Sequence, residues 1–258
     1  MQKGGADLVN RDFEAYYEYL DMEEFFMLLT SEEITRIKEK SVIHQYRKGQ
    51  IIYFQDDPKH YSFFILKGLV RLERTDSEDA YKYLDFVKEK NFFSYSSVIT
   101  FEKYTHSAYS VTDADLLLIP IDLMVEIMKN NHRQLFYMYS KLSEIKVFQE
   151  ARIQKVAISS AVDRVIQSLS LWMYDLGRVI GGQMIIPYPL TIYELAIVAG
   201  TTRETAGRVV RKLTKEGRVE FNRKQVIFFD EEFFEDNTLF LHEFGIDYTS
   251  KLVGYLEP

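Results

Sequence analysis

Residues 191–217 restrict the fold of this chain more than any other segment, because they predict two helices joined by a tight turn. Thr191 and Glu194 have the Thr-x-x-Glu spacing of a capping box, in which each side chain accepts a hydrogen bond from the other residue's backbone N–H. The first helix is therefore expected to begin here. Gly200 occupies the position where a residue in the left-handed conformation ends a helix. The chain is thus predicted to change direction directly after Gly200.

A second helix is predicted to follow this turn. Thr201 and Glu204 repeat the capping-box spacing, and Gly217 supplies a second helix end. Apolar residues in between recur at intervals of three and four, which places them on one face of a helix: Ala206, Val209, Val210 and Leu213. Charged residues remain for the other face. Two helices connected by a glycine-containing turn form a helix-turn-helix, whose second helix enters the major groove of DNA.

The segment after the second helix strengthens this interpretation. A basic amphipathic helix alone is not specific for DNA, since most such helices carry only solvated charge. Short β-prone runs at residues 218–221 and 226–229 flank Asn222-Arg-Lys-Gln225, which predicts a hairpin with a basic tip. A hairpin in this position is the wing of a winged helix, and its tip supplies a second contact to phosphate.

Charge is distributed unevenly along the chain. The 258 residues have a net charge of −7, which is unlike a broadly basic nucleic-acid binder. Residues 191–229 nevertheless contain eight Lys or Arg against four Asp or Glu, whereas residues 230–258 contain eight acidic residues and one lysine. Basic charge is therefore concentrated where DNA would lie. The acidic remainder limits non-specific binding, which depends mainly on neutralisation of phosphates.

Composition excludes several classes of protein. Cysteine is absent, which excludes disulfides, thiolate catalysis and Cys-ligated zinc or iron–sulfur clusters. We find no pairing of nucleophile and base, no phosphate-binding glycine loop and no cluster of metal ligands, so neither an enzyme nor a metal or cofactor site is predicted. No apolar run approaches the roughly 18 residues of a membrane span, and the N-terminus lacks the pattern of a secretion signal. We expect a cytoplasmic protein without membrane contact.

The whole chain is predicted to be α+β and to have five parts. They are a helical N-terminal extension at 1–21, an antiparallel β-roll of the jelly-roll type at 22–131, a long helix at 132–158, a winged helix-turn-helix domain at 159–229 and an acidic C-terminal extension at 230–258. The β-roll is predicted from many short β-prone runs at close spacing, separated by turn signals.

The long helix is expected to join two copies of the chain. About 27 residues would extend about 40 Å, which is more than a small domain needs internally. Its seam residues are three or four apart: Leu135, Met138, Leu142, Ile145, Gln149, Ile153 and Val156. Phe136, Tyr139 and Phe148 supply a second apolar face, so one face is predicted to pack on the roll and the seam on a partner. A homodimer agrees with the two-fold sites that helix-turn-helix proteins bind.

Three motifs occur in an order known from one family. Residues 47–57 (RKGQIIYFQDD) and 63–72 (FFILKGLVRL) are similar to the first two turns of that family's β-roll. Residues 202–208 (TRETAGR) resemble its Ser-Arg-Glu-Thr-Val-Gly-Arg recognition segment, which is the most specific match. Over roughly residues 22–229 the chain thus resembles the Crp/Fnr superfamily of bacterial transcription regulators.

The resemblance implies roles in binding double-stranded DNA. The residues expected to read bases are Thr202, Arg203, Glu204 and Arg208. In the major groove, Arg pairs with guanine and Glu accepts from the cytosine amine. The expected half-site resembles TGTGA, repeated as an inverted pair. The residues expected to bind phosphates are Arg211, Lys212, Lys215, Arg223 and Lys224. RNA polymerase is the further partner that the family implies.

Two departures from the family concern cyclic AMP. Members that bind it have Gly-Glu in the phosphate-binding turn, followed by an Arg-Ser pair. Here Ser94 and Tyr95 stand in place of Gly-Glu, and His106 stands in place of the Arg. The ribose would lose its acceptor and the phosphate its bidentate partner, so control by cyclic AMP is not expected. The PrfA-like members also lack these residues and carry extra residues after the wing, which makes them the nearest subgroup.

Three functional hypotheses remain open at this point. The first is a dimeric transcription regulator that binds an inverted-repeat operator without cyclic AMP. The second is a receptor of the same fold that needs an unidentified, non-nucleotide effector for DNA binding, with Phe93, Tyr95, His106, Tyr109 and Tyr137 as the candidate effector pocket. The third is a cyclic-nucleotide-binding module that does not bind DNA.

Overall fold

The computed structural model describes residues 16, 20, 23–76, 82–93, 101–156 and 158–238. They form two compact units, and the chain passes from the first to the second within the long helix α5 (His132–Val156), after Leu142. Residues 82–84 also belong to the second unit. Apart from Tyr16 and Leu20, the predicted N-terminal extension lies outside the described residues, as does the chain beyond residue 238.

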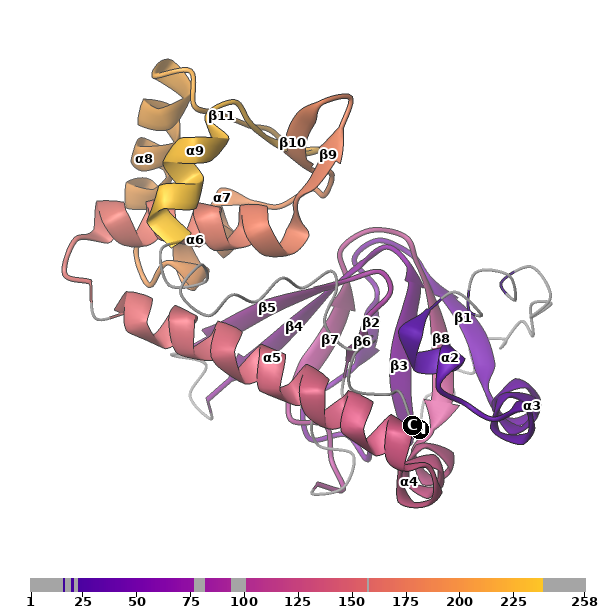
Figure 1. Cartoon of the computed structure of the whole chain (residues 1–258). Helices are drawn as coiled ribbons and strands as arrows, with labels where there is room; N and C mark the ends of the chain where they lie inside the picture. Colours follow the sequence, from indigo (N-terminus) through magenta and orange to yellow (C-terminus); the bar gives the residue numbers. More distant parts are fainter. Residues whose placement is uncertain are drawn as a thin grey trace. The chain divides into compact units, whose positions relative to one another are not determined.

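The first unit is a β-roll with helices on either side of it in the sequence. Its elements are α2 (Glu24–Met27), α3 (Ser31–Lys40), β1 (Val42–Tyr46), β2 (Ile51–Tyr53), β3 (Tyr61–Lys67), β4 (Leu69–Thr75), β5 (Lys82–Lys88), β6 (Phe92–Phe93), β7 (Ser107–Ser110), β8 (Ala114–Pro120) and α4 (Ile121–Asn130). The strands make two four-stranded sheets, in the orders β1-β8-β3-β6 and β2-β7-β4-β5 (Figure 1). The predicted N-terminal β domain is confirmed.

Glycine permits the tight reversal between β3 and β4. Gly68 has a φ of +100°, a backbone conformation that side chains with a Cβ rarely adopt. A Cβ at this position would lie 2.6 Å from the backbone oxygen of Asp113. The turn at Lys67-Gly68 therefore depends on the absence of a side chain at Gly68.

Aromatic rings fill the interior of the roll. Phe63 of β3 lies opposite Phe93 of β6, and their rings stack with centroids 4.9 Å apart. Tyr53 stacks on Tyr104 at 3.7 Å and lies 5.3 Å from Phe63. The Tyr104 hydroxyl donates to the Tyr61 carbonyl (3.1 Å), so its polar atom is satisfied. These rings belong to one buried core cluster with aliphatic residues of both sheets.

A second aromatic group covers the other side of the β3–β6 pair. Neighbouring strand residues face opposite sides of a sheet, so Phe64 and Phe92 point away from the first cluster. Their rings lie 4.9 Å apart, and Phe25 of α2 lies 4.5 Å from Phe92. Phe25 also contacts Tyr137 of α5, with ring centroids 6.0 Å apart. The sheet is thus buried on both faces at this point.

The predicted long helix is confirmed as α5, but its buried face differs from the expectation. Gln134, Tyr137 and Met138 are the buried residues of its first turns. Phe136 and Tyr139, expected on a face packed against the roll, are 65% and 69% exposed. That part of the prediction is wrong because a glutamine contributes to the buried face: the Gln134 amide donates to the Phe25 carbonyl. Apolar spacing does not reveal such a face.

The second unit is a winged helix-turn-helix domain. Its elements after α5 are α6 (Ala161–Leu176), β9 (Arg178–Ile180), β10 (Gln183–Ile186), α7 (Ile192–Val198), α8 (Arg203–Lys215), β11 (Val219–Phe221), β12 (Val226–Phe228), α9 (Glu231–Glu235) and the 3-10 helix η1 (Asp236–Thr238). The wing strands β11 and β12 continue into β10 and β9 as one sheet, in the order β11-β12-β10-β9. The β9–β10 hairpin had not been predicted. Among the described residues, no helix is long and apolar enough to cross a membrane.

Candidate nucleic-acid interface

Helix α7 begins at the predicted capping box. The Thr191 hydroxyl accepts from the Glu194 backbone N–H (3.2 Å), and the Glu194 carboxylate accepts from the Thr191 backbone N–H (2.8 Å). Glu194 is buried, so the carboxylate is held in place by the hydrogen bonds that it makes to Thr191. These bonds satisfy N–H groups that the helix leaves without an internal partner. Local sequence is sufficient to set this helix start.

The turn between the two helices also follows local rules. Gly200 has a φ of +58°, and its N–H donates to the Ile197 carbonyl (3.0 Å). The Thr201 N–H donates to the Ala196 carbonyl (2.9 Å). This pair of bonds is the Schellman arrangement, in which the two residues after a helix satisfy its last carbonyls.

Helix α8 starts one residue later than predicted. Thr202, not Thr201, is the N-cap, and its hydroxyl accepts from the Thr205 backbone N–H (3.2 Å). The predicted Thr201–Glu204 capping box is wrong because the bond to Ala196 commits Thr201 to the end of α7. Glu204 is therefore exposed and does not reach back to cap the helix.

One face of α8 is buried and the other carries the predicted DNA contacts. The apolar face is buried as expected: Ala206, Val209, Val210 and Leu213. All nine residues predicted to contact DNA are exposed: Thr202, Arg203, Glu204, Arg208, Arg211, Lys212, Lys215, Arg223 and Lys224. The Arg208 guanidinium lies 3.3 Å from the Thr205 hydroxyl, which accepts from it. Thr205 thus orients the arginine one turn from the start of the helix.

The wing ends in a four-residue turn with basic side chains at its tip. The Asn222 side-chain oxygen accepts from the backbone N–H groups of Lys224 (2.8 Å) and Gln225 (3.0 Å). The Asn222 N–H donates to the Gln225 carbonyl (3.1 Å), which closes the hairpin. Arg223 and Lys224 occupy the two central positions of this turn. Asparagine fixes the backbone, and the two cations project from it.

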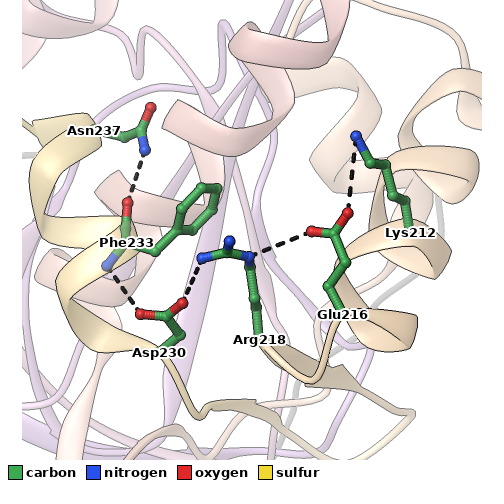
Figure 2. A network of polar contacts seen from close by, with 6 residues as sticks. All are labelled: Lys212, Glu216, Arg218, Asp230, Phe233 and Asn237. Atoms are coloured by element: carbon green, nitrogen blue, oxygen red, sulfur yellow. Dashed lines mark hydrogen bonds and ion pairs between the residues drawn. The ribbon is translucent and has the colours of Figure 1, made fainter.

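Two arginines that sequence analysis did not single out hold the domain together. Arg164 of α6 donates to the carbonyls of Ala199 (3.0 Å) and Gly200 (3.1 Å), at the turn between α7 and α8. The same guanidinium donates to the carbonyls of Ile158 (2.8 Å) and Ser159 (3.1 Å). Arg218 forms a second network, at the start of the wing (Figure 2). Each also binds a group distant in sequence, Ala199 and Gly200 for Arg164 and Asp230 for Arg218, and local spacing could not have identified these contacts.

The candidate effector residues of the roll lie in different surroundings. Phe93 is part of the interior aromatic cluster, whereas Tyr137 contacts Phe25 on the other side of the β3–β6 pair. Tyr109 lies under the Arg71 guanidinium, 5.2 Å from the ring centroid. Tyr95 lies outside the described residues.

His106 is a poor cation in this structure. It is half-buried, and its Nδ1 lies 2.9 Å from the Thr105 hydroxyl. Burial lowers the pKa of its imidazole, and the positive charge of Arg74 lowers it further, against an opposing effect of Asp85. The lowered pKa disfavours the charged imidazolium, and a single ring N–H cannot form the bidentate pair that an arginine makes with a phosphate.

The predicted dimer seam is mostly exposed in the single chain. Leu135, Leu142, Ile145 and Ile153 are exposed, Gln149 is half-buried, Met138 is buried, and the side chain of Val156 lies outside the described residues. Metal ligands do not gather in groups of three or more anywhere in the described part of the chain.

Comparison with known families agrees with this architecture. The family described as a cyclic nucleotide-binding domain matches residues 43–131, and the family described as a Crp-like helix-turn-helix domain matches residues 163–236. The second match includes α9 as well as the wing.

Individual relatives and solved structures give the same picture. The chain is 28% identical to the HTH-type transcriptional regulator ArcR of Staphylococcus haemolyticus over 197 residues, 74% of this chain and 84% of the relative. It is 27% identical to the ArcR of Staphylococcus aureus over 177 residues, 67% of this chain and 74% of the relative. The structure of FixK2 from Bradyrhizobium japonicum has the same fold, with a TM-score of 0.66 at 18% identity over 76% of this chain and 96% of that one.

A cyclic nucleotide-binding domain followed by a long helix and a Crp-like helix-turn-helix is the architecture of a family of transcription regulators rather than of enzymes. This chain therefore belongs to the Crp/Fnr family of DNA-binding transcription regulators.

Proposed function

We propose that this protein is a homodimeric regulator that reads an inverted-repeat operator with the first turns of α8 and grips the flanking phosphates with the end of α8 and the wing. The observation that carries the proposal is the division of α8 into a buried apolar face and an exposed face with the predicted contacts. The N-terminal residues of a recognition helix contact base edges. Arg203, Glu204 and Arg208 have the donor and acceptor groups that guanine and cytosine require.

Dimerisation through α5 supplies the two-fold symmetry of such an operator. Leu135, Tyr139 and Leu142 follow one another at intervals of three and four, and all three are exposed in the single chain. Apolar residues in one stripe on a helix surface are typical of a subunit interface. The occupant we propose is α5 of a second copy.

Cyclic AMP does not control this regulator in our proposal. His106, whose charged form is disfavoured by burial and by Arg74, stands where the cyclic-AMP-binding members of the family have an arginine. Phe63, Phe93, Tyr53 and Tyr104 occupy the interior of the roll, where their rings pack on one another. Within the family we place the chain nearest to the PrfA-like members, on the basis of the missing cyclic-nucleotide residues and the residues after the wing.

The proposal is tested by operator binding. Fluorescence anisotropy is measured with a duplex of inverted TGTGA half-sites, and with a set that changes one base pair at a time. Arg208→Ala should weaken binding to the intact site by about 1–3 kcal/mol and remove discrimination at one base pair. Removal of an exposed arginine of the β-roll, Arg47→Ala, is the matched control and should leave affinity unchanged. Millimolar cyclic AMP should leave the operator affinity of the wild type and of both variants unchanged.

Three outcomes would contradict parts of the proposal. Equal loss on all duplexes would mean that Arg208 contacts phosphate. A higher operator affinity in the presence of cyclic AMP would contradict the proposal that cyclic AMP does not control this regulator. For the dimer, Leu142→Glu should give monomers in sedimentation velocity, whereas Met27→Glu, a charge at an exposed methionine of α2, should leave dimers. Dimers of Leu142→Glu would exclude the α5 interface.

A further inference from the structure

Arg218 lies where the recognition helix, the wing and the C-terminal helix meet. Its backbone N–H donates to the Leu213 carbonyl (3.0 Å), which closes the end of α8. Its own carbonyl accepts from the Phe229 N–H (2.9 Å), which joins the two strands at the base of the wing. The backbone of this residue therefore belongs to both elements.

The Arg218 guanidinium contacts two residues, the α9 N-cap Asp230 through a nitrogen and Phe233 of α9 through its planar face (Figure 2). One guanidinium nitrogen pairs with the Asp230 carboxylate, and the guanidinium carbon lies 4.0 Å from the centroid of the Phe233 ring. The Nε atom lies 3.3 Å from Glu216, the C-cap of α8. A planar guanidinium held at two nitrogens and on one face has a defined orientation, which a point charge would not have.

Helix α9 is held in place by packing against the wing and by hydrogen bonds at both of its ends. Phe234 is fully buried, and its ring meets that of Phe228 of the wing at 4.8 Å, edge to face. The Asp230 carboxylate also caps α9 by accepting from the Phe233 N–H (3.2 Å). The Asn237 amide donates to the Phe233 carbonyl (2.7 Å), at the other end of the helix (Figure 2). In Figure 1, α9 lies against α6, within the same unit.

The network continues to a residue with a proposed DNA contact. Glu216 lies 3.8 Å from the Lys212 ammonium, a long and exposed pair that a phosphate can displace. Glu216 is shared with Arg218, whose own position is fixed by α9. Charges thus alternate from Lys212 through Glu216 and Arg218 to Asp230.

We propose that Arg218 is a positioning residue for the wing, and that α9 is consequently part of the DNA-binding apparatus. By holding Arg218 between Asp230 and Phe233, α9 sets the direction in which the β11–β12 hairpin leaves α8. Arg223 and Lys224 then reach the phosphates while α8 occupies the groove. This inference rests on the proposed function, and it assigns a role to residues 230–235, whose own negative charge repels DNA.

The experiment measures whether Arg223 of the wing still contributes a phosphate contact when the ion pair between Arg218 and α9 is lost. Asp230→Asn removes the charge that pairs with Arg218 but retains a good helix cap, because asparagine is favoured at that position. Arg223→Ala is introduced into the wild type and into Asp230→Asn, and the salt dependence of operator binding is determined for all four proteins. In the wild type, loss of one phosphate contact should lower the slope by about 1. In Asp230→Asn, the same change should lower it by less than about half of that.

Controls separate positioning from stability. Asp236→Asn removes the same charge at an exposed residue at the end of α9, and there Arg223→Ala should retain its full effect. Arg218→Lys keeps the positive charge but loses the planar contact, so it should behave as Asp230→Asn does. A purely stabilising role would lower the melting temperature of Asp230→Asn and leave the Arg223→Ala effect intact, which would overturn the inference. No effect of Arg223→Ala in the wild type would overturn the proposed wing contact, and this inference with it.

Discussion

The two units of the chain differ in where they place their characteristic side chains: the β-roll buries aromatic rings, whereas the DNA-binding domain exposes charged residues on α8. In the β-roll, Phe63 and Phe93 are buried and stack on each other within a cluster of apolar and aromatic residues. In the winged helix-turn-helix domain, Arg203, Glu204 and Arg208 are exposed on α8, with no apolar cover. The aromatic cluster of the roll is shielded from water, whereas the exposed face of α8 presents charge to it.

This difference shows where each unit obtains its order. The aromatic cluster of the roll joins residues from strands far apart in the sequence, so its stability depends on long-range packing. The DNA-binding domain also has a buried apolar core, but its helix starts and turns are set by short-range devices such as caps and a Schellman turn. Loss of volume should accordingly have its largest effect in the aromatic cluster of the roll, whereas the helix starts and turns of the DNA-binding domain should be sensitive to loss of single hydrogen bonds.

The largest effect is expected from Phe63→Ala. Truncating a buried phenylalanine costs about 3–5 kcal/mol, since it loses transfer free energy and leaves a cavity beside Phe93 and Tyr53. Urea unfolding followed by near-ultraviolet circular dichroism measures this loss. Phe54→Ala is the matched control, because that ring is 56% exposed, and it should change stability by less than about 0.5 kcal/mol. Equal, small losses at both positions would mean that the interior cluster is loosely packed.

A smaller effect is expected at the start of α8. Thr202→Ala removes the N-cap hydroxyl and should lower the free energy of unfolding by about 1 kcal/mol. Thr201→Ala removes a neighbouring threonine whose backbone, not its side chain, makes the turn, so it should cost less. Thermal unfolding of the two variants provides the comparison. A larger loss for Thr201→Ala would favour the capping box first predicted from the sequence.

Short-range order was also what the sequence revealed best. The helix-turn-helix, its glycine turn and the wing were predicted because each depends on a few neighbouring residues. The N-cap of α8 was misplaced by one residue, since a Schellman bond to Ala196 competes for Thr201. The face that α5 buries was missed because Gln134 is part of it. The contacts of Arg164 and Arg218 could not be predicted, because their partners come together only in the folded domain.

The candidate sites divide in the same way. The residues expected to contact DNA lie on consecutive turns of one helix and at one hairpin tip, so local spacing was sufficient to group them. The expected effector pocket required residues from separate strands and α5, and strand alternation puts Phe93 and Tyr137 on opposite sides of the β3–β6 pair. Ser94 and Tyr95, on which the exclusion of cyclic AMP also depended, lie outside the described residues.

The smallest predicted effect concerns His106 and acid. Because burial and Arg74 lower the pKa of the folded imidazole below the ordinary value of 6.5, the unfolded chain binds a proton first as the pH falls. The contribution of His106 to stability is therefore fully present above about pH 7 and is lost as the pH falls through 6.5 towards the folded pKa. His106→Gln cannot be protonated. Between pH 7 and pH 5, its free energy of unfolding should therefore fall by less than that of the wild type. Urea unfolding of both proteins at both pH values measures this difference.

The control for this prediction is His132→Gln, which removes a histidine that is exposed at the start of α5. Carboxylates that titrate over the same range are shared by all three proteins, so their contribution cancels in the comparison. Wild-type acid sensitivity in His106→Gln would mean that the ring is protonated as easily in the folded chain as in the unfolded one. A cation would then be present at this position of the roll, and the electrostatic argument against phosphate binding there would be lost. Reduced acid sensitivity in His106→Gln alone would instead show that the folded roll disfavours the charged imidazolium, in contrast to α8, whose charged side chains are exposed.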